Sequence, residues 1–235
     1  MKKLFKLTAM LLIAGAMMMT GCTRDPNALP GTWTSTAKYY EYEHNDEGNY
    51  NRVAGTGPTY VYTPNYELPE EEFTYPSKPN SFNHTVWPMT YDHNFTGFEA
   101  TVISTTDSTI VGIPFYINID RSSTPAKWSY YTLFINSDKQ YRLKVKLNGG
   151  EATDVYDWTT SEAIKKPTEK NTILVYQDKE GNLIIKINGT QVEIIRPNDL
   201  LLKQGDVGII TPVTYEQLTA RTDFTSTYQF NKFQY

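Results

Sequence analysis

Paired carboxylates are the first feature of this 235-residue sequence that could carry out acid–base chemistry. Glu41 and Glu43 stand at alternate positions of a β-type stretch, so their side chains point the same way, two strand rises or ~6.6 Å apart. Glycoside hydrolysis needs two carboxyl groups at ~5–9.5 Å. The pair runs into the turn-forming stretch 44–48, however, and a turn seldom provides the desolvated cleft that perturbs carboxylates. We therefore interpret the pair as a solvated hairpin end and keep catalysis as the alternative.

Oxygen-bearing side chains in the same stretch raise the question of a metal. Asp46 and Asn49 are chemically suitable ligands for Ca²⁺, but their spacing matches no EF-hand loop. Asn, Asp and Gly are also the residues that turns require. A single cysteine and three histidines exclude a cysteine-built zinc or iron–sulfur site. We expect no cofactor, with calcium at Asp46 and Asn49 as the alternative.

Aromatic side chains are the third feature, because their flat faces and polar edges suit ligand binding. The richest segment is 82–91, whose composition indicates a loop, and a second cluster spans 128–131. Within that cluster, strand alternation places Tyr130 and Tyr131 on opposite faces, so one of them belongs to the core. Large rings also dominate β-protein cores, and Trp158 is interpreted as a core residue. The candidate ligand-binding residues are His84, Trp87, Tyr91, His93 and Trp128.

The N-terminus has the layout of an export signal. Three lysines within the first six residues precede the apolar stretch 7–19, and the small residues Thr20 and Gly21 follow. The apolar stretch is too short for a comfortable transmembrane helix. The alternative to a lipid attachment signal is an ordinary signal peptide followed by a free thiol at Cys22, which is unusual in an exported protein.

The residues around this cysteine resemble the lipobox of bacterial lipoproteins. Met19-Thr20-Gly21-Cys22 matches it except at Met19, where the family usually has leucine. The resemblance implies that residues 1–21 are removed and that lipidated Cys22 anchors the protein in the cell envelope, in the outer membrane or on the cell surface. Removal of 1–21 takes three lysines and no acids from 22 basic and 26 acidic residues, so the mature net charge is −7. This charge argues against nucleic acid or an anionic lipid surface as a partner.

The remainder of the chain is predicted to be one all-β domain at residues 31–235, preceded by a polar tether at 22–30. Alternation in 140–147 buries Leu143 and exposes its lysine and arginine neighbours. Another alternating stretch, 183–187, meets Asn188-Gly189, which is a type I′ turn signal. The proline-rich segment 63–80 is expected to be a long loop. Strands are expected at 32–43, 50–62, 98–105, 110–119, 130–136, 155–158, 172–177, 207–210 and 224–233.

The second half of the chain resembles the concanavalin A-like lectin/glucanase sandwiches, in particular their laminin-G-like and keto-disaccharide-hydrolase-like branches. The resemblance covers about 95–233 and rests on an Asn-led strand at 171, a strand that ends in Asn188-Gly189, and the Gly-x-Val-Gly strand that begins at Gly205. It implies a jelly-roll β-sandwich. The Glu-x-Asp-x-Glu signature of the glucanases is absent. The scaffold hosts lectins, hydrolases and adhesion modules alike, so it does not decide the function.

The sequence thus favours a membrane-anchored lipoprotein whose non-catalytic sandwich binds glycan or a host or envelope protein. A carbohydrate-active glycoside hydrolase is the first alternative, and a structural envelope protein is the second. The lipid anchor, a tether and a scaffold associated with binding favour the first class, since no convincing catalytic constellation occurs.

Overall fold

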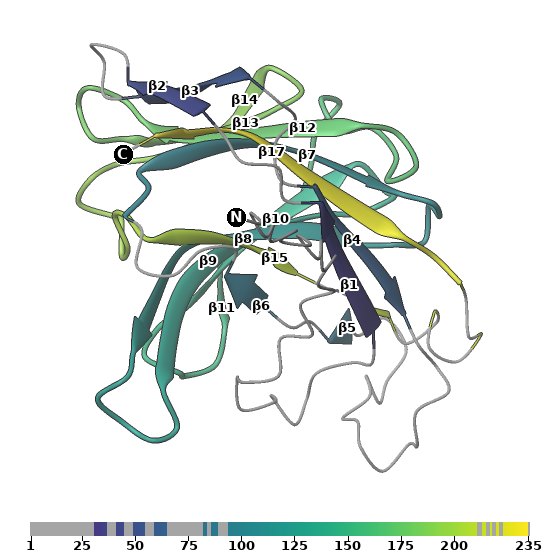
Figure 1. The fold of residues 1–235 in the computed structure, drawn as a ribbon, viewed down its shortest axis with the longest axis horizontal. Coiled ribbons are helices and arrows are strands. Elements are labelled where there is room, and N and C mark those ends of the chain that lie inside the picture. Colours follow the sequence, from purple (N-terminus) through teal and green to yellow (C-terminus); the bar gives the residue numbers. More distant parts are fainter. Residues whose placement is uncertain are drawn as a thin grey trace, which may run out of the picture.

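The computed structural model describes residues 31–36, 41–44, 49–54, 59–64, 82–83, 86–88, 94–210, 213–214, 217, 220 and 223–234. Before residue 94 it describes the backbone of the strands, with side-chain burial only at Thr59 and Val61. Two antiparallel sheets are stacked face to face, with yellow β17 in one and β8, β9 and β10 in the other (Figure 1). The expected all-β sandwich is confirmed.

The larger sheet contains nine of the described strands, in the order β1-β4-β17-β7-β12-β13-β14, with β3 paired to both β17 and β2. All of its pairings are antiparallel. The strands are β1 (Gly31–Thr36), β2 (Glu41–His44), β3 (Asn49–Ala54), β4 (Thr59–Pro64), β7 (Gly97–Ser104), β12 (Asn171–Gln177), β13 (Leu183–Ile187), β14 (Thr190–Ile195) and β17 (Ser226–Gln234).

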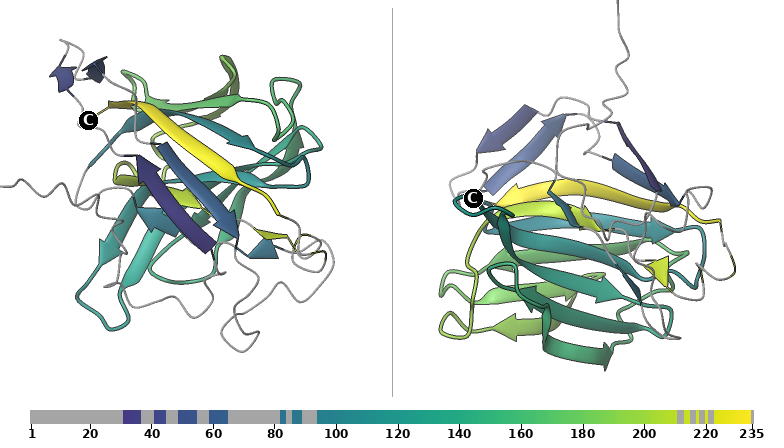
Figure 2. Two further views of the ribbon diagram at one scale, coloured as in Figure 1. Left: turned by 45° about the vertical axis from the view of Figure 1, so that its right-hand side comes forward. Right: turned by 90° about the horizontal axis from the view of Figure 1, so that it is seen from below.

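The smaller sheet contains six of the described strands, in the order β11-β10-β9-β8-β15-β6, and β16 and β5 form a separate pair. The strands of the six-stranded sheet are β6 (Val86–Pro88), β8 (Val111–Asp120), β9 (Lys127–Ile135), β10 (Gln140–Lys146), β11 (Thr153–Thr160) and β15 (Asp206–Ile210). The separate pair consists of β5 (Phe82–Asn83) and β16 (Val213–Thr214). Figure 2 shows the two layers from two further sides.

The core lies between the two sheets and follows the alternation of the sequence. In β10, Leu143 and Val145 are buried while Arg142, Lys144 and Lys146 are partly exposed. Tyr131 belongs to this core and Tyr130 does not, although both are buried, so the two tyrosines occupy opposite faces of β9 as expected. Burial of the apolar strand faces is the main source of the sandwich's stability.

Tyrosines connect the two layers. The hydroxyl of buried Tyr228 in β17 donates to the carbonyl of Ile210 in β15 at 2.8 Å. The hydroxyl of Tyr141 in β10 donates to the Glu193 carboxylate in β14 at 2.5 Å. Burial raises the pKa of Tyr228 and, reinforced by Glu193, the pKa of Tyr141. Both hydroxyls therefore stay protonated and act as donors between the sheets.

The hairpin predicted from the stretch 183–187 and the Asn188-Gly189 turn is confirmed. Asn188 and Gly189 have φ angles of 50° and 84°, as a type I′ turn requires. Asn188 also donates its side-chain amide to the Oδ1 of buried Asn171 at 2.9 Å, and that Oδ1 accepts the Lys165 N–H at 3.0 Å. The two asparagines that carry the family resemblance therefore fasten the 161–170 loop to β12 and to this turn.

A β-bulge with one extra residue in β8 exchanges the core-facing and outward-facing positions in the last part of the strand. Phe115 pairs with Tyr131 of β9, yet the next pair is Asn118 with Ser129, so β8 uses three residues where β9 uses two. Tyr116 lies inside this bulge with a φ of 52°. Both Phe115 and Tyr116 pack into the core. The bulge therefore shifts the alternation by one residue at the end of β8.

Four sequence expectations are corrected by the structure. The single strands expected at 32–43 and 50–62 are each divided between two strands with different partners, because β1 and β4 pair with each other while β2 pairs with β3. The segment 82–91, expected to be a loop, contributes the short strands β5 and β6. Trp158 is not in the core: it is partly exposed, and the Arg142 guanidinium lies over its ring at 5.7 Å.

Candidate functional site

A pocket lies at the end of β8, on the outward side of the six-stranded sheet. Its volume is about 410 Å³, within the range of ~300–1,000 Å³ that is typical of small-ligand sites. The lining residues are Asn94, Ile117, Asn118, Ile119, Asp120, Arg121 and Asp206. Most come from β8 and the turn after it, and Asp206 comes from the neighbouring strand β15.

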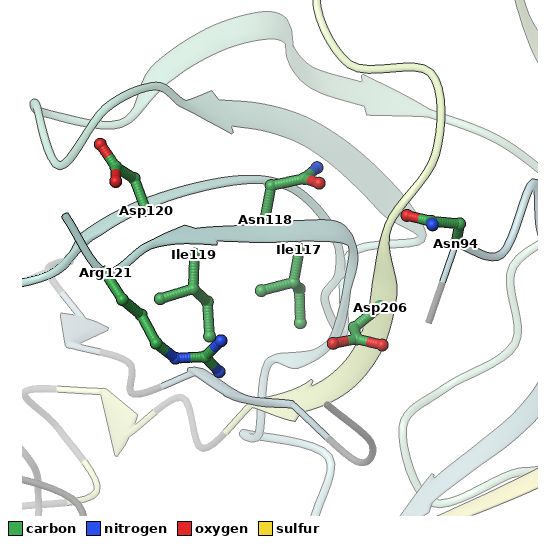
Figure 3. A pocket seen from close by; sticks show the side chains of 7 residues that line it. All are labelled: Asn94, Ile117, Asn118, Ile119, Asp120, Arg121 and Asp206. Carbon is green, nitrogen blue, oxygen red and sulfur yellow. The ribbon is translucent and has the colours of Figure 1, made fainter. Parts of the chain in front are cut away.

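The β8 bulge decides which side chains enter the pocket. Figure 3 shows the side chains of Ile117 and Ile119 on one side of β8 and those of Asn118 and Asp120 on the other. Without the extra residue, strict alternation would place Ile117 and Ile119 on the same face as core residue Phe115. The bulge turns them outward instead, and they form an aliphatic floor.

Two charged groups stand at opposite ends of this floor. The Arg121 guanidinium and the Asp206 carboxylate lie on the same side of β8 as the isoleucines (Figure 3). Asp206 is only 4% exposed, and both charged residues interact with other groups of the protein. A guanidinium and a nearly buried carboxylate therefore flank an apolar surface. This is the combination that fixes the orientation of a polar ligand.

The polar side chains on the other side of β8 support the backbone. The Asn118 side-chain amide donates to the carbonyls of Tyr116 at 2.9 Å and Gln204 at 3.0 Å, which ties the bulge to the chain before β15. Ser122 donates its backbone N–H to the Asp120 carboxylate at 2.9 Å. Hydrogen bonds from Ser122 lower the pKa of Asp120, so this carboxylate is ionised and engaged in its own turn.

Gly205 permits the close approach of β15 to the bulge. A Cβ atom at this position would lie 2.6 Å from the carbonyl carbon of Tyr116 and 2.8 Å from the nitrogen of Ile117. Gly205 also exchanges two backbone hydrogen bonds with Phe95, at 3.1 and 3.2 Å, which holds the segment with Asn94 beside the pocket. Only glycine fits between these backbones.

Of the ligand-binding residues predicted from the sequence, Trp128 lies beside the pocket. It pairs with Ile119 across β8 and β9, so the two side chains share one face of the sheet. Trp128 is partly exposed. Ile117, Arg121 and Asp206 are not among the residues predicted from the sequence. A signal was present only for Asp206, which belongs to the Gly-x-Val-Gly strand, and it indicated the scaffold rather than a site.

The other predicted site residues are not tested by the described structure. Trp87 pairs with Ile209 through its backbone, but its side chain is outside the described part. The backbones of Glu41, Glu43 and Asn49 lie in β2 and β3. The residues Cys22, Asp46, His84, Tyr91 and His93 lie outside the described residues, as do the tether and most of the 63–80 loop.

The described residues contain neither a metal-binding cluster nor a membrane-spanning helix. Among them, no group of three or more His, Cys, Asp or Glu residues could hold a metal ion. No helix in the part of the chain that the structure describes is long and apolar enough to cross a membrane.

Comparisons with known proteins find similarity only at the level of structure. No family model matches the sequence, and no curated protein is significantly similar to it. Solved structures that match include the carbohydrate-binding module CBM66 from Bacillus subtilis (12% identity, 88% of this chain and 98% of that chain, TM-score 0.42). They also include a Bacillus licheniformis β-glucanase (10%, 86% and 92%, 0.44) and a Bacteroides ovatus mixed-linkage glucan GH16 protein bound to a G4G4G3G product (10%, 86% and 93%, 0.48).

At these identities the likeness concerns the fold alone. The fold itself is established by the two antiparallel sheets of the chain. These sheets confirm the prediction of an all-β sandwich. What such a sandwich binds must be argued from its own site.

Proposed function

We propose that this protein is an exported, lipid-anchored β-sandwich that binds glycan without hydrolysing it. The observation that carries the proposal is the pocket at the end of β8. It combines an aliphatic floor of Ile117 and Ile119 with the Arg121 guanidinium, the Asp206 carboxylate and the neighbouring indole of Trp128. Glycan takes precedence over a protein ligand because the pocket has the volume of a small-ligand site, about 410 Å³, whereas protein interfaces are large.

The chemistry of a pyranose ring matches these groups. One face of the ring presents C–H groups, which pack on partly exposed Ile119 or on the Trp128 ring. Each hydroxyl both donates and accepts hydrogen bonds, so it can accept from the Arg121 guanidinium. A volume of about 410 Å³ lies in the range of small-ligand sites and accommodates a short saccharide.

The arrangement of carboxylates supports a binding role over a hydrolytic one. Glycoside hydrolysis needs two carboxyl groups that face the same bond. The two carboxylates that line the pocket, Asp120 and Asp206, leave β8 and β15 on different sides of the floor (Figure 3). Asp120 is also engaged by Ser122. A hydrolase built on Glu41 and Glu43 stays the alternative.

Export and anchoring rest on the N-terminal sequence. Residues 1–21 have the charged, apolar and small-residue regions of a secretory signal, and Cys22 occupies the lipidation position of a lipobox. Two or more acyl chains give stable membrane attachment, whereas one is marginal. The Cys22→Ser variant is therefore expected to leave the membrane fraction and to lose fatty-acid label. Unchanged membrane partition of this variant would refute lipid anchoring.

A glycan array with full-length protein in mild detergent tests the binding proposal. Trp128→Ala and Arg121→Ala are each expected to weaken binding of the best glycan by about 1–3 kcal/mol, or about 5- to 150-fold in Kd. Tyr176→Ala is the matched control, because Tyr176 is a partly exposed ring under the Lys186 ammonium on the other sheet. Trp87→Ala tests the aromatic site predicted at 82–91.

Three results would contradict the proposal. The first is that no glycan binds. The second is that Tyr176→Ala weakens binding as much as Trp128→Ala does. The third is that the wild type releases sugar products and the double variant Glu41→Gln, Glu43→Gln does not, which would move the protein to the glycoside hydrolases.

A further inference from the structure

A row of three cationic side chains lies on the outward face of β10. Arg142, Lys144 and Lys146 alternate with core residues, and their register partners on β9 are Phe134, Thr132 and Tyr130. Trp128 shares a face of β9 with Tyr130, because the two are separated by one residue. The cationic row therefore runs along the same face of the sheet as the pocket.

The Arg142 end of the row is neutralised and rigid. Its guanidinium donates to both oxygens of Asp154, at 2.6 and 2.7 Å, and approaches Asp157 at 3.4 Å. The guanidinium also lies over the Trp158 ring. Bidentate pairs of this kind fix the geometry of arginine. This end offers a flat, preorganised surface but no excess of charge.

At the Lys146 end of the row, the positive charge is not balanced by the neighbouring carboxylates that the structure describes. Lys144 makes only a 3.9 Å contact with the same Asp154. Among the described residues, no ion pair involves Lys146, which is partly exposed. The excess therefore increases along β10 toward the turn at 147–150.

Trp128 connects this end of the row to the pocket. On one side it pairs with Ile119 of the pocket floor, and on the other it lies diagonally across the ladder from Lys146. The backbone N–H of Gly149, just after β10, donates to the Trp128 carbonyl at 2.9 Å. A chain that leaves the pocket over the indole therefore reaches Lys146 and then Lys144.

We propose that the glycan is acidic: a polysaccharide with regularly spaced carboxylate or sulfate groups that extends from the pocket across Trp128 to Lys146 and Lys144. The proposal rests on the glycan-binding function proposed above and adds its ligand class. The mature charge of −7 does not oppose it, because a charge acts over only ~8 Å at physiological ionic strength. The contact with the acidic groups is made at the end of the row, by Lys146 and Lys144.

Matched pairs of acidic and neutral probes test this ligand class. Titration calorimetry of the full-length protein in detergent would compare oligogalacturonate with its methyl ester, and dextran sulfate with dextran. The two pairs distinguish carboxylate from sulfate. We expect the acidic member of at least one pair to bind ~10-fold more tightly at low salt, and the difference to shrink when NaCl screens the charges.

Variants locate the effect on the surface. Lys146→Ala is expected to weaken binding of the acidic probe about 2- to 5-fold, as exposed ion pairs do, and to leave the neutral probe unchanged. Lys186→Ala, on the other sheet, is the control and is expected to change neither. An unchanged melting temperature of Lys146→Ala would show that the variant is folded.

The possible failures are distinguishable. Equal binding of acidic and neutral probes, or an equal effect of the two lysine variants, would overturn the acidic class while the glycan-binding function stands. Binding to no glycan at all would overturn both. Tighter binding of single-stranded DNA than of every glycan would replace the glycan by a nucleic acid, which basic rows with aromatic residues also bind.

Discussion

Substitution of Gly205 by alanine would test whether the close approach of β15 to the β8 bulge stabilises the sandwich. The added Cβ would lie 2.6 Å from the carbonyl carbon of Tyr116 and 2.8 Å from the nitrogen and oxygen of Ile117. All three atoms belong to the backbone, so no rotamer change removes the overlap. Gly205 also has a φ of 157°, which side-chain-bearing residues rarely adopt.

The expected cost combines two effects. Overpacking in a close-packed interior costs ~1–3 kcal/mol, and a sparsely populated backbone conformation costs a further ~1–3 kcal/mol, so we expect about 2–6 kcal/mol in the free energy of unfolding. In a chain of this size each kcal/mol lowers the melting temperature by ~2–4 °C, which gives a fall of about 4–24 °C.

Gly189→Ala separates the overlap from the backbone effect. Gly189 has a φ of 84°, but no atom lies within 4 Å of the position that a Cβ would take there, so its substitution should cost only the conformational ~1–2 kcal/mol. Urea denaturation followed by circular dichroism measures both variants. Equal costs for the two, or a cost below ~1 kcal/mol for Gly205→Ala, would refute the close approach.

Two further predictions concern the core. Ile185→Ala should lower the free energy of unfolding by ~2–5 kcal/mol, because this side chain is fully buried. Ile194 is 48% exposed on the neighbouring strand, so Ile194→Ala should change it by no more than ~0.5 kcal/mol. Similar losses for the two variants in urea denaturation would contradict the assignment of the strand faces. Burial raises the pKa of Tyr116, Tyr141 and Tyr228, so the stability that their protonated forms provide is complete below pH ~10 and is lost as the pH rises further. The tyrosinate absorbance of these three buried tyrosines should appear together with unfolding, and its appearance near pH ~10 in the folded protein would exclude this coupling.

Local sequence signals are sufficient for the central strands. The alternation in β10 and the Asn188-Gly189 turn are determined by residues that are adjacent in the sequence. The strand and the turn can therefore be predicted without knowledge of the rest of the chain. The division of the expected strands 32–43 and 50–62 depends on long-range pairing, because β1 pairs with β4 while β2 pairs with β3. Gly55, Gly57 and Pro58 are a local turn signal for the second division, whereas the stretch 37–40 contains no glycine or proline.

Trp128 and Trp158 of the six-stranded sheet show what local sequence signals do not determine. The scaffold resemblance predicts a core position for Trp158, yet this residue lies outside the core beneath Arg142. The aromatic cluster predicts a ligand contact for Trp128, which lies beside Ile119 at the pocket. Both occur in similar β-type sequence, and their surroundings are set by residues on other strands. Sequence alternation alone does not contain this information.

The pocket floor depends on the β8 bulge, and Gly205 is needed because β15 packs closely against the same bulge. Period-two alternation would carry Ile117 and Ile119 into the core after Phe115, and the extra residue at Tyr116 turns them outward. Because Gly205 lies against this bulge, Gly205→Ala should disturb the pocket floor and the fold together. Arg121→Ala should weaken glycan binding at unchanged stability, since its guanidinium lies at the rim of the floor. Comparison of the two variants therefore separates the scaffold of the site from its binding groups.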